Sequence, residues 1–217
     1  HNTTQQATQS QREREMASMR GLETFISDIR NCRNKDDEVQ RVERELANVR
    51  AHFGGGKALT PYERRKYTWK LVYIAMLGYD VDFGHTEFIH LMNSTKFAEK
   101  LAGYTAATVL LPGTEDLRSL VVNAIRSDLS LVTSPFAQAL ALSSIAEIAT
   151  KDLAALLVAD VQGVLFSSVS MPDVRKKAAL ALLRLHRANP EVPNDEEHAP
   201  RLMPLLEERH LGLANAN

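Results

Sequence analysis

Two prolines set 37 residues apart open matching segments in the second half of the chain. Pro135 and Pro172 each begin a run of apolar residues with helical spacing, and proline suits the first helical position because an N–H there would lack a partner. At this offset, Ala141–Ile148 aligns with Ala178–Leu185, with apolar residues falling mostly on apolar residues. A repeat of this length indicates that one structural unit recurs along the chain.

Helical periodicity also covers the rest of the chain from Met19 onward, without the sustained alternation that a strand would show. We expect helices over residues 19–32, 36–53, 61–78, 85–93, 96–111, 115–129, 135–149, 152–167, 172–188 and 196–209. Helix pairs that recur every 35 to 45 residues or so are typical of HEAT or armadillo solenoids. The sequence therefore predicts an all-α fold, an alpha-solenoid of stacked antiparallel helix pairs. The alternative is a chance match between helices rich in alanine and leucine.

Composition bounds the class of protein. The chain has 217 residues, of which 44% are hydrophobic, and only 10 glycines and 8 prolines, so it can bury a large helical core. No apolar run is long enough to cross a bilayer, and His1–Gln11 lacks the apolar segment of a signal peptide. Cys32 is the single cysteine, which fits a reducing compartment. These features predict a soluble cytoplasmic protein with a disordered tail over 1–18 and one solenoid over 19–217.

Nothing in the sequence indicates catalysis. The seven histidines are scattered, and His85 and His90 are five positions apart, which does not place both on one helix face. No Gly-x-Ser-x-Gly motif is present for a serine nucleophile. We therefore expect no metal, no cofactor and no enzymatic activity, and a solenoid of this kind serves by default as a binding surface.

Charge is distributed unevenly along the chain. Residues 20–70 carry 12 Lys/Arg and 8 Asp/Glu, whereas residues 71–217 carry 12 and 17. Thr60 and Glu63 form the capping box of a helix, and Arg64, Arg65 and Lys66 follow within its first turns. Cations at this end oppose the helix dipole, whereas free backbone N–H groups there attract phosphate. This pattern is better explained by an anion-binding site than by a contribution to helix stability. The alternative is an exposed charged face without a ligand.

The chemistry of that anion is narrowed by the neighbouring residues. Only Tyr62, Tyr67 and Trp69 lie close by, fewer aromatic side chains than single-stranded nucleic acid usually requires. We therefore expect a membrane phosphate and no nucleic acid. A purely structural scaffold whose basic cluster contacts an acidic protein remains a second hypothesis.

Several motifs carry a resemblance to a known family. They are Met19–Leu22, Phe25–Cys32, Glu45–Asn48, Lys57–Leu59, Leu77–Asp80, Asp82–His85 and His210–Gly212. Together they resemble the alpha-adaptins, large subunits of the endocytic clathrin adaptor complex, and the resemblance runs from Met19 to the last residue. It implies a HEAT-like trunk that acts as a peripheral protein on the inner face of the plasma membrane and at coated pits. It also implies assembly with a sigma small subunit, beta-adaptin and a mu subunit.

The resemblance further implies specific binding residues. Phosphatidylinositol bisphosphate would meet Arg20, Arg64, Arg65, Lys66, Tyr67 and Lys70. The chain departs from the family at His52 and Gly54, where lysines are usual, so the site has fewer cations than expected.

Two further expectations concern cargo and the last helix. The resemblance implies that acidic dileucine sorting peptides bind jointly to this chain and the sigma subunit, with their acidic residue against Arg30. The sequence alone suggests instead that Arg30 is a surface arginine or a partner of Asp28 or Asp37.

An apolar stripe near the end (Leu202, Leu205, Leu206 and Leu211) predicts that the chain is the N-terminal part of a longer trunk.

Overall fold

The computed structural model describes residues 19–56, 58–111, 118–130, 134–192, 200 and 202, and within these ranges it holds helices and no strand. The helices are α2 (Arg20–Arg30), α3 (Lys35–Gly54), α4 (Pro61–Met76), α5 (His85–Met92), α6 (Phe97–Leu110), α7 (Arg118–Leu129), α8 (Pro135–Ile148), α9 (Lys151–Leu165) and α10 (Pro172–Ala188). Their bounds lie within about three residues of those expected, so the prediction of an all-α chain is confirmed.

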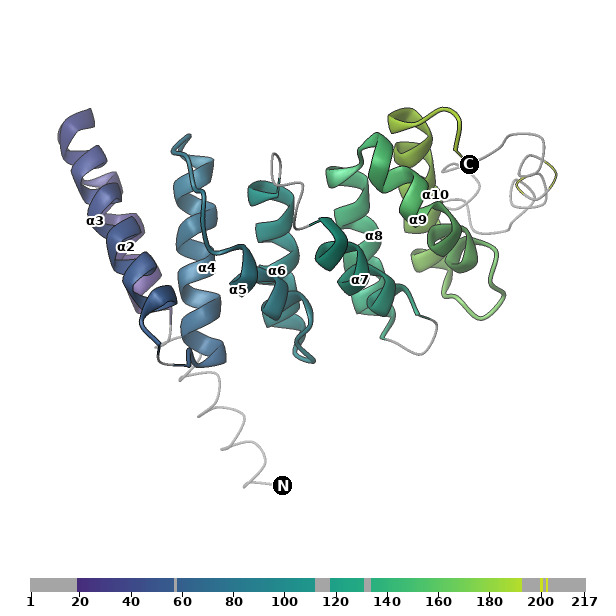
Figure 1. Ribbon diagram of the computed structural model, residues 1–217, viewed down its shortest axis with the longest axis horizontal. Coiled ribbons are helices and arrows are strands. Elements are labelled where there is room, and N and C mark those ends of the chain that lie inside the picture. Colours follow the sequence, from purple (N-terminus) through teal and green to yellow (C-terminus); the bar gives the residue numbers. More distant parts are fainter. Residues whose placement is uncertain are drawn as a thin grey trace, which may run out of the picture.

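The helices stack in two layers (Figure 1). In one layer α4, α6, α8 and α10 lie side by side and run in the same direction, and α5, α7 and α9 form the other layer. The helices of the first layer begin at residues 61, 97, 135 and 172, so successive starts are 36, 38 and 37 residues apart. The repeat predicted from two prolines therefore extends back to α4, and the fold is the expected alpha-solenoid.

Side-chain caps explain why these helices begin where they do. Thr60 Oγ1 accepts from the Glu63 N–H at 3.2 Å, and the Glu63 carboxylate accepts from the Thr60 N–H at 3.0 Å, which is the predicted capping box. Ser134 and Thr150 cap α8 and α9 in the same way through one bond each. Each cap satisfies a backbone N–H that would otherwise lack a partner.

Two apolar clusters hold the stack together. The larger one runs from α3 to α10, and its most deeply buried members include Leu71, Phe88 and Tyr104. A smaller one, formed by Phe25, Ile29, Val42 and Ile74, attaches α2 to α3 and α4. Trp69 is partly buried and packs against the larger cluster.

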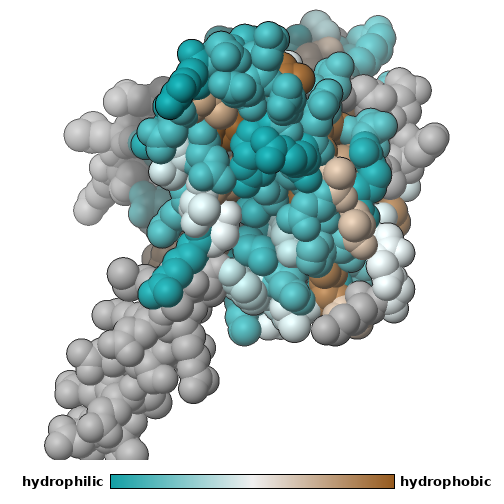
Figure 2. Space-filling model, turned by 90° about the vertical axis from the view of Figure 1, so that its left-hand side faces the viewer, coloured by the Kyte–Doolittle hydropathy of each residue, from teal (hydrophilic) through white to brown (hydrophobic). Residues whose placement is uncertain are grey.

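The N-terminal end of the solenoid is polar. Figure 2 views this end directly, and the surface there is mostly hydrophilic. Because α2 and α3 bury one face each and leave the other to water, they end the stack on this side.

Some expectations fall on residues outside the described ranges. The tail over 1–18 lies outside them, as do Leu205, Leu206 and Leu211. Of the helix expected over 196–209, residues 200 and 202 are described and both are helical, with Leu202 packed against the main core. Among the described helices, none is long and apolar enough to cross a membrane.

Candidate functional site: a basic cluster at the start of α4

The basic cluster consists of Arg20, Arg64, Arg65, Lys66 and Lys70, with Tyr67 beside them. It forms because the starts of α2 and α4 lie at the same edge of the solenoid (Figure 1). A Cβ atom on Gly21 would lie 3.5 Å from Lys66 Cδ, so the first turn of α2 packs directly against this lysine. Arg20, exposed at the first position of α2, is thereby carried next to α4.

Lys66 lies over an aromatic surface. Its Nζ is 4.3 Å from the centre of the Tyr67 ring and 5.4 Å from that of Tyr62, which is within cation–π range. Burial lowers the pKa of the Lys66 ammonium, and repulsion from Lys70 lowers it further. A bound anion would relieve this repulsion, so the surroundings of Lys66 favour a negatively charged ligand.

The two arginines beside it differ in their contacts. Arg64 donates from Nε to the carboxylate of Glu87, and both side chains of this pair are largely buried between α4 and α5. Arg65 keeps its Nε buried with no hydrogen-bond partner among the described residues. Because that Nε is buried, only the rest of the half-buried Arg65 guanidinium could reach a ligand, whereas Arg64 already holds a carboxylate.

Lys70 lies inside the protein, which departs from its expected place in a lipid site. Its Nζ is 2.6 Å from Glu45 Oε1, and both side chains are buried between α3 and α4. Burial alone would raise the pKa of the Glu45 carboxyl, but hydrogen bonds from Lys70, Arg41 and Asn48 outweigh it and lower that pKa. The ammonium of Lys70 is thus committed to a structural ion pair.

Tyr67 forms the inner wall of the site rather than an exposed contact. Its ring is buried, with the His52 ring centre 4.6 Å away and the Phe53 ring centre 6.1 Å away. Burial raises the pKa of the Tyr67 hydroxyl, so the side chain stays neutral. Tyr67 supports Lys66 and His52 from below.

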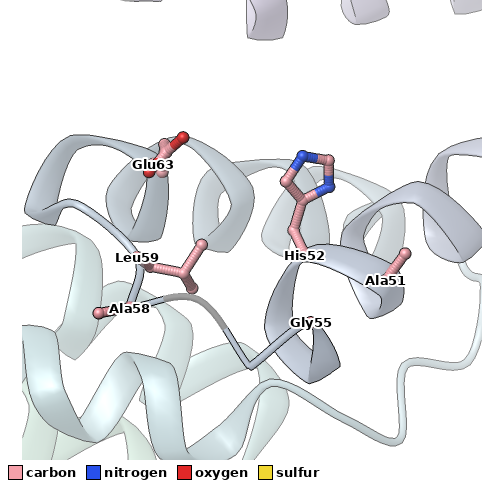
Figure 3. Close-up of a pocket in the computed structure, with 6 residues that line it drawn as sticks. All are labelled: Ala51, His52, Gly55, Ala58, Leu59 and Glu63. Atoms are coloured by element: carbon pink, nitrogen blue, oxygen red, sulfur yellow. The ribbon is translucent and has the colours of Figure 1, made fainter.

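A hollow opens next to this wall (Figure 3). It has a volume of about 310 Å³ and is lined by Ala51, His52, Gly55, Ala58, Leu59 and Glu63. His52 and Glu63 point toward the same side of it. These lining residues belong to the end of α3, the connection after it and the start of α4.

Most backbone donors at the start of α4 are already used. The N–H of Glu63 donates to Thr60 Oγ1, the N–H of Arg64 donates to the Thr60 carbonyl, and Pro61 has no N–H. The expectation that free N–H groups here attract phosphate therefore needs correction, because the cap competes for them. An anion at this corner would depend on the side chains of the basic cluster.

Arg30 lies at the opposite edge, because α2 carries Arg20 at its first residue and Arg30 at its last, about 15 Å away along the axis. Its side chain is exposed. Asp28, one of the expected partners, instead accepts from Arg41 Nε at 3.0 Å. Next to Arg30, a second hollow of about 290 Å³ is lined by Asp28, Asn31, Cys32, Arg33, Asp37, Gln40, Arg41 and Arg44.

Sequence reasoning missed the carboxylates that hold two of the cations. Glu45 precedes Lys70 by 25 positions and Glu87 follows Arg64 by 23, so no local pattern connects them. A weak signal was available for Glu45, since it falls on the apolar face of its helix, three positions after Val42 and four before Val49. Across the described ranges, no group of three His, Cys, Asp or Glu side chains is placed to hold a metal ion.

Comparison with known proteins identifies the family to which this helical stack belongs. A stack of helix pairs of this kind defines a helical-repeat protein. The family described as "Adaptin N terminal region" matches residues 38–216. The chain therefore belongs to the adaptin family.

Individual relatives agree with this assignment. The chain is 48% identical over 202 residues to AP-2 complex subunit alpha-1 of Arabidopsis thaliana, a match covering 93% of the chain and 20% of that protein. It is 42% identical over 196 residues to AP-2 complex subunit alpha-2 of Dictyostelium discoideum (90% and 20%). Identity to the mouse AP-1 complex subunit gamma-like 2 is 33% over 192 residues (88% and 23%). These values confirm the resemblance to alpha-adaptins, and the chain spans about a fifth of the length of these relatives.

Proposed function

We propose that this chain is part of a clathrin adaptor subunit in endocytosis and binds phosphatidylinositol bisphosphate at the inner face of the plasma membrane. The binding residues are Arg20, Arg65 and Lys66, with Tyr67 as the supporting wall. Assembly with a sigma subunit, beta-adaptin and a mu subunit belongs to the same proposal, as the likeness to AP-2 alpha subunits suggests. Arg64 and Lys70 are assigned structural roles because each already holds a carboxylate, part-buried for Arg64 and buried for Lys70.

The observation that carries this proposal is the packing of α2 on Lys66. It brings an exposed arginine from the start of α2 beside cations that follow it by some 45 positions in the sequence. The nearest carboxylate, Glu63, is engaged in the capping box. Three cations on two helices suit an anion with several phosphates better than they suit a single carboxylate.

The expected affinity is low. Each basic residue near an anionic bilayer contributes about 1 kcal/mol, so three contribute about 3 kcal/mol. That corresponds to a dissociation constant weaker than about 1 mM. Useful recruitment would then require other lipid and cargo sites of the assembled complex acting together.

A double charge reversal tests the proposal. We expect Arg20→Glu with Lys66→Glu to lower binding to vesicles containing phosphatidylinositol bisphosphate at least tenfold or so, because two attractions become repulsions. Binding of the unaltered chain should also weaken steeply as salt is raised, since exposed charges are screened beyond about 8 Å at physiological ionic strength. Vesicle co-sedimentation across a lipid titration measures both effects.

The matched control is Arg33→Glu with Arg44→Glu, which makes the same change in net charge before and in the middle of α3, away from the start of α4. It should retain most of the binding. Equal loss in both variants would mean that vesicles sense only net charge. Unchanged binding in the first variant would contradict the lipid proposal, and salt-sensitive capture of an acidic protein without lipid would then favour the scaffold hypothesis.

We propose a second role for Arg30 in reading acidic dileucine sorting peptides together with a sigma subunit. The observation that favours it is the pairing of Asp28 with Arg41, which removes the nearest carboxylate from competition. Arg30 is exposed at the end of α2, beside a hollow that also presents Arg33 and Arg44. An acidic side chain arriving there would meet positive charge.

The assembled complex is the right material for testing Arg30, since the proposed site spans two subunits. Losing a charge-assisted hydrogen bond costs about 1.5 to 3 kcal/mol, or roughly 10- to 150-fold in affinity. We expect Arg30→Glu to weaken peptides that carry the upstream acidic residue by that factor, and peptides lacking it by much less. Isothermal titration with both peptides measures the difference, and equal weakening would exclude direct reading of that residue by Arg30.

A further inference from the structure

The starts of four helices share one edge of the solenoid. Figure 1 shows α4, α6, α8 and α10 running in the same direction, with their first residues along the lower edge. Side-chain contacts agree with this arrangement. The Phe97 and Phe136 rings, at the starts of α6 and α8, lie 6.3 Å apart, while Lys177 of α10 contacts Ser143 of α8 and Arg184 contacts Ala146.

Large apolar side chains are exposed along this edge. Phe97 and Phe136, in the first turns of α6 and α8, are 50% and 73% exposed. Val169 and Met171, in the connection leading into α10, are 78% and 54% exposed. Burial of large apolar groups is favourable, so their exposure brings no benefit to the folded chain by itself.

Their positions differ from those of other exposed apolar residues. Leu180 and Leu183, for example, are 42% and 39% exposed in the middle of α10. Phe97, Phe136 and Met171 lie instead at helix starts, where the side chain leaves the end of the stack. Each step from one helix to the next is about 10 Å, so the apolar row from α6 to α10 spans about 20 Å. A row of this length fits a flat surface better than a pocket.

The charges at this edge are mostly positive. Lys96 is exposed directly before Phe97, and the half-buried Lys176 follows Met171 in the second turn of α10, whereas Lys177 reaches Ser143 in the middle of α8. Lys96 pairs with Glu99, which also accepts a hydrogen bond from Ser94, and Asp173 is an exposed acid in the first turn of α10. At its α4 end the same edge carries the basic cluster.

We propose that this edge lies flat on an anionic bilayer, with Phe97, Phe136 and Met171 inserted at the level of the lipid headgroups. The inference rests on the proposed lipid function of the basic cluster and extends it along three more helices. Aromatic side chains favour the membrane interface, and surfaces that combine lysines with apolar groups bind anionic lipids through both. The basic cluster selects the headgroup. The apolar row, formed by Phe97, Phe136 and Met171, adds a contribution to membrane binding that salt does not screen.

Tryptophan substitutions test the insertion directly. In Phe136→Trp, we expect the new indole to shift its emission to shorter wavelength on vesicles containing phosphatidylinositol bisphosphate and to be quenched by lipids brominated on their acyl chains. The chain has one natural tryptophan, Trp69, which packs partly against the core and serves as an internal reference. Met76→Trp is the matched control, because Met76 is 72% exposed at the opposite end of α4. Equal quenching of both variants, or no quenching of Phe136→Trp, would overturn the proposal.

A second variant separates this inference from the function on which it rests. Phe97→Ser with Phe136→Ser should lower vesicle binding about tenfold and remove the part of the binding that persists at high salt. Arg20→Glu with Lys66→Glu should remove the salt-sensitive part and leave the apolar part in place. If the serine variant binds vesicles normally but no longer associates with other adaptor subunits, the edge is a protein interface and the proposal fails. If Arg20→Glu with Lys66→Glu binds vesicles normally while the serine variant does not, the proposed lipid binding by the basic cluster is contradicted instead.

Discussion

Replacing Gly103 by alanine should lower the free energy of unfolding by about 2 kcal/mol. A Cβ atom at this position of α6 would lie 2.5 Å from the Met92 nitrogen, 2.7 Å from the Phe88 oxygen and 2.9 Å from the Leu91 carbonyl carbon. All three are backbone atoms of α5, so no side chain can rotate away, and the two helices must separate. Overpacking of this kind costs about 1 to 3 kcal/mol, and occasionally more.

The better helix propensity of alanine, worth about 1 kcal/mol, offsets part of that cost. Gly163→Ala isolates the offset, because Gly163 is exposed in α9 and a Cβ atom there would have nothing within 4 Å. We expect this control to be more stable than the unaltered chain by about 1 kcal/mol. Urea unfolding followed by circular dichroism measures both, and a Gly103→Ala variant as stable as Gly163→Ala would show that α5 and α6 tolerate separation.

The close approach at Gly103 also shows where sequence reasoning ended. Helix starts could be predicted because Thr60, Ser134 and Thr150 act locally on backbone N–H groups within three positions. The repeat could be predicted because helix pairs of constant length leave a periodic pattern. A glycine that admits another backbone has no such signature, since nothing in the local sequence shows which segment approaches it.

The candidate site likewise has a part that the sequence could predict and a part that it could not. The capping box and the run of cations after it are local, so Arg64, Arg65 and Lys66 could be named from the sequence. Whether each cation is available depends on carboxylates more than 20 positions away, Glu87 for Arg64 and Glu45 for Lys70. Only tertiary packing brings these pairs together, so the sequence could not show that Arg64 and Lys70 each hold a carboxylate.

Lys70→Met should separate a structural role from a lipid role. Removing one partner of a buried ion pair leaves an uncompensated charge and costs about 3 to 5 kcal/mol. Arg41 and Asn48 still donate to Glu45, at 2.9 and 3.1 Å, so we expect a loss near the lower end, about 3 kcal/mol. Adding Glu45→Gln should restore part of the stability, since it removes a buried carboxylate that has lost one of its two cationic partners.

The effect of pH has a definite sign. Because the pKa of Glu45 is lowered below its ordinary value of 4.5 in the folded chain, its contribution to stability is present above that pH and is lost as pH falls below it. Lys70 supplies the leading hydrogen bond that lowers this pKa. The stability difference between the unaltered chain and Lys70→Met should therefore be largest above pH 4.5 and should narrow in more acidic buffers.

The same variant tests which lysine reaches the lipid. With both variants folded, as circular dichroism would show, Lys66→Met should weaken binding to bisphosphate vesicles about fivefold, the equivalent of one basic residue at the membrane surface. Lys70→Met should leave binding within about twofold of the unaltered chain, because its ammonium is buried against Glu45 and contacts no solvent-facing anion. Equal weakening by the two substitutions would mean that Lys70 leaves Glu45 when lipid binds, and that the buried pair opens as part of membrane recognition.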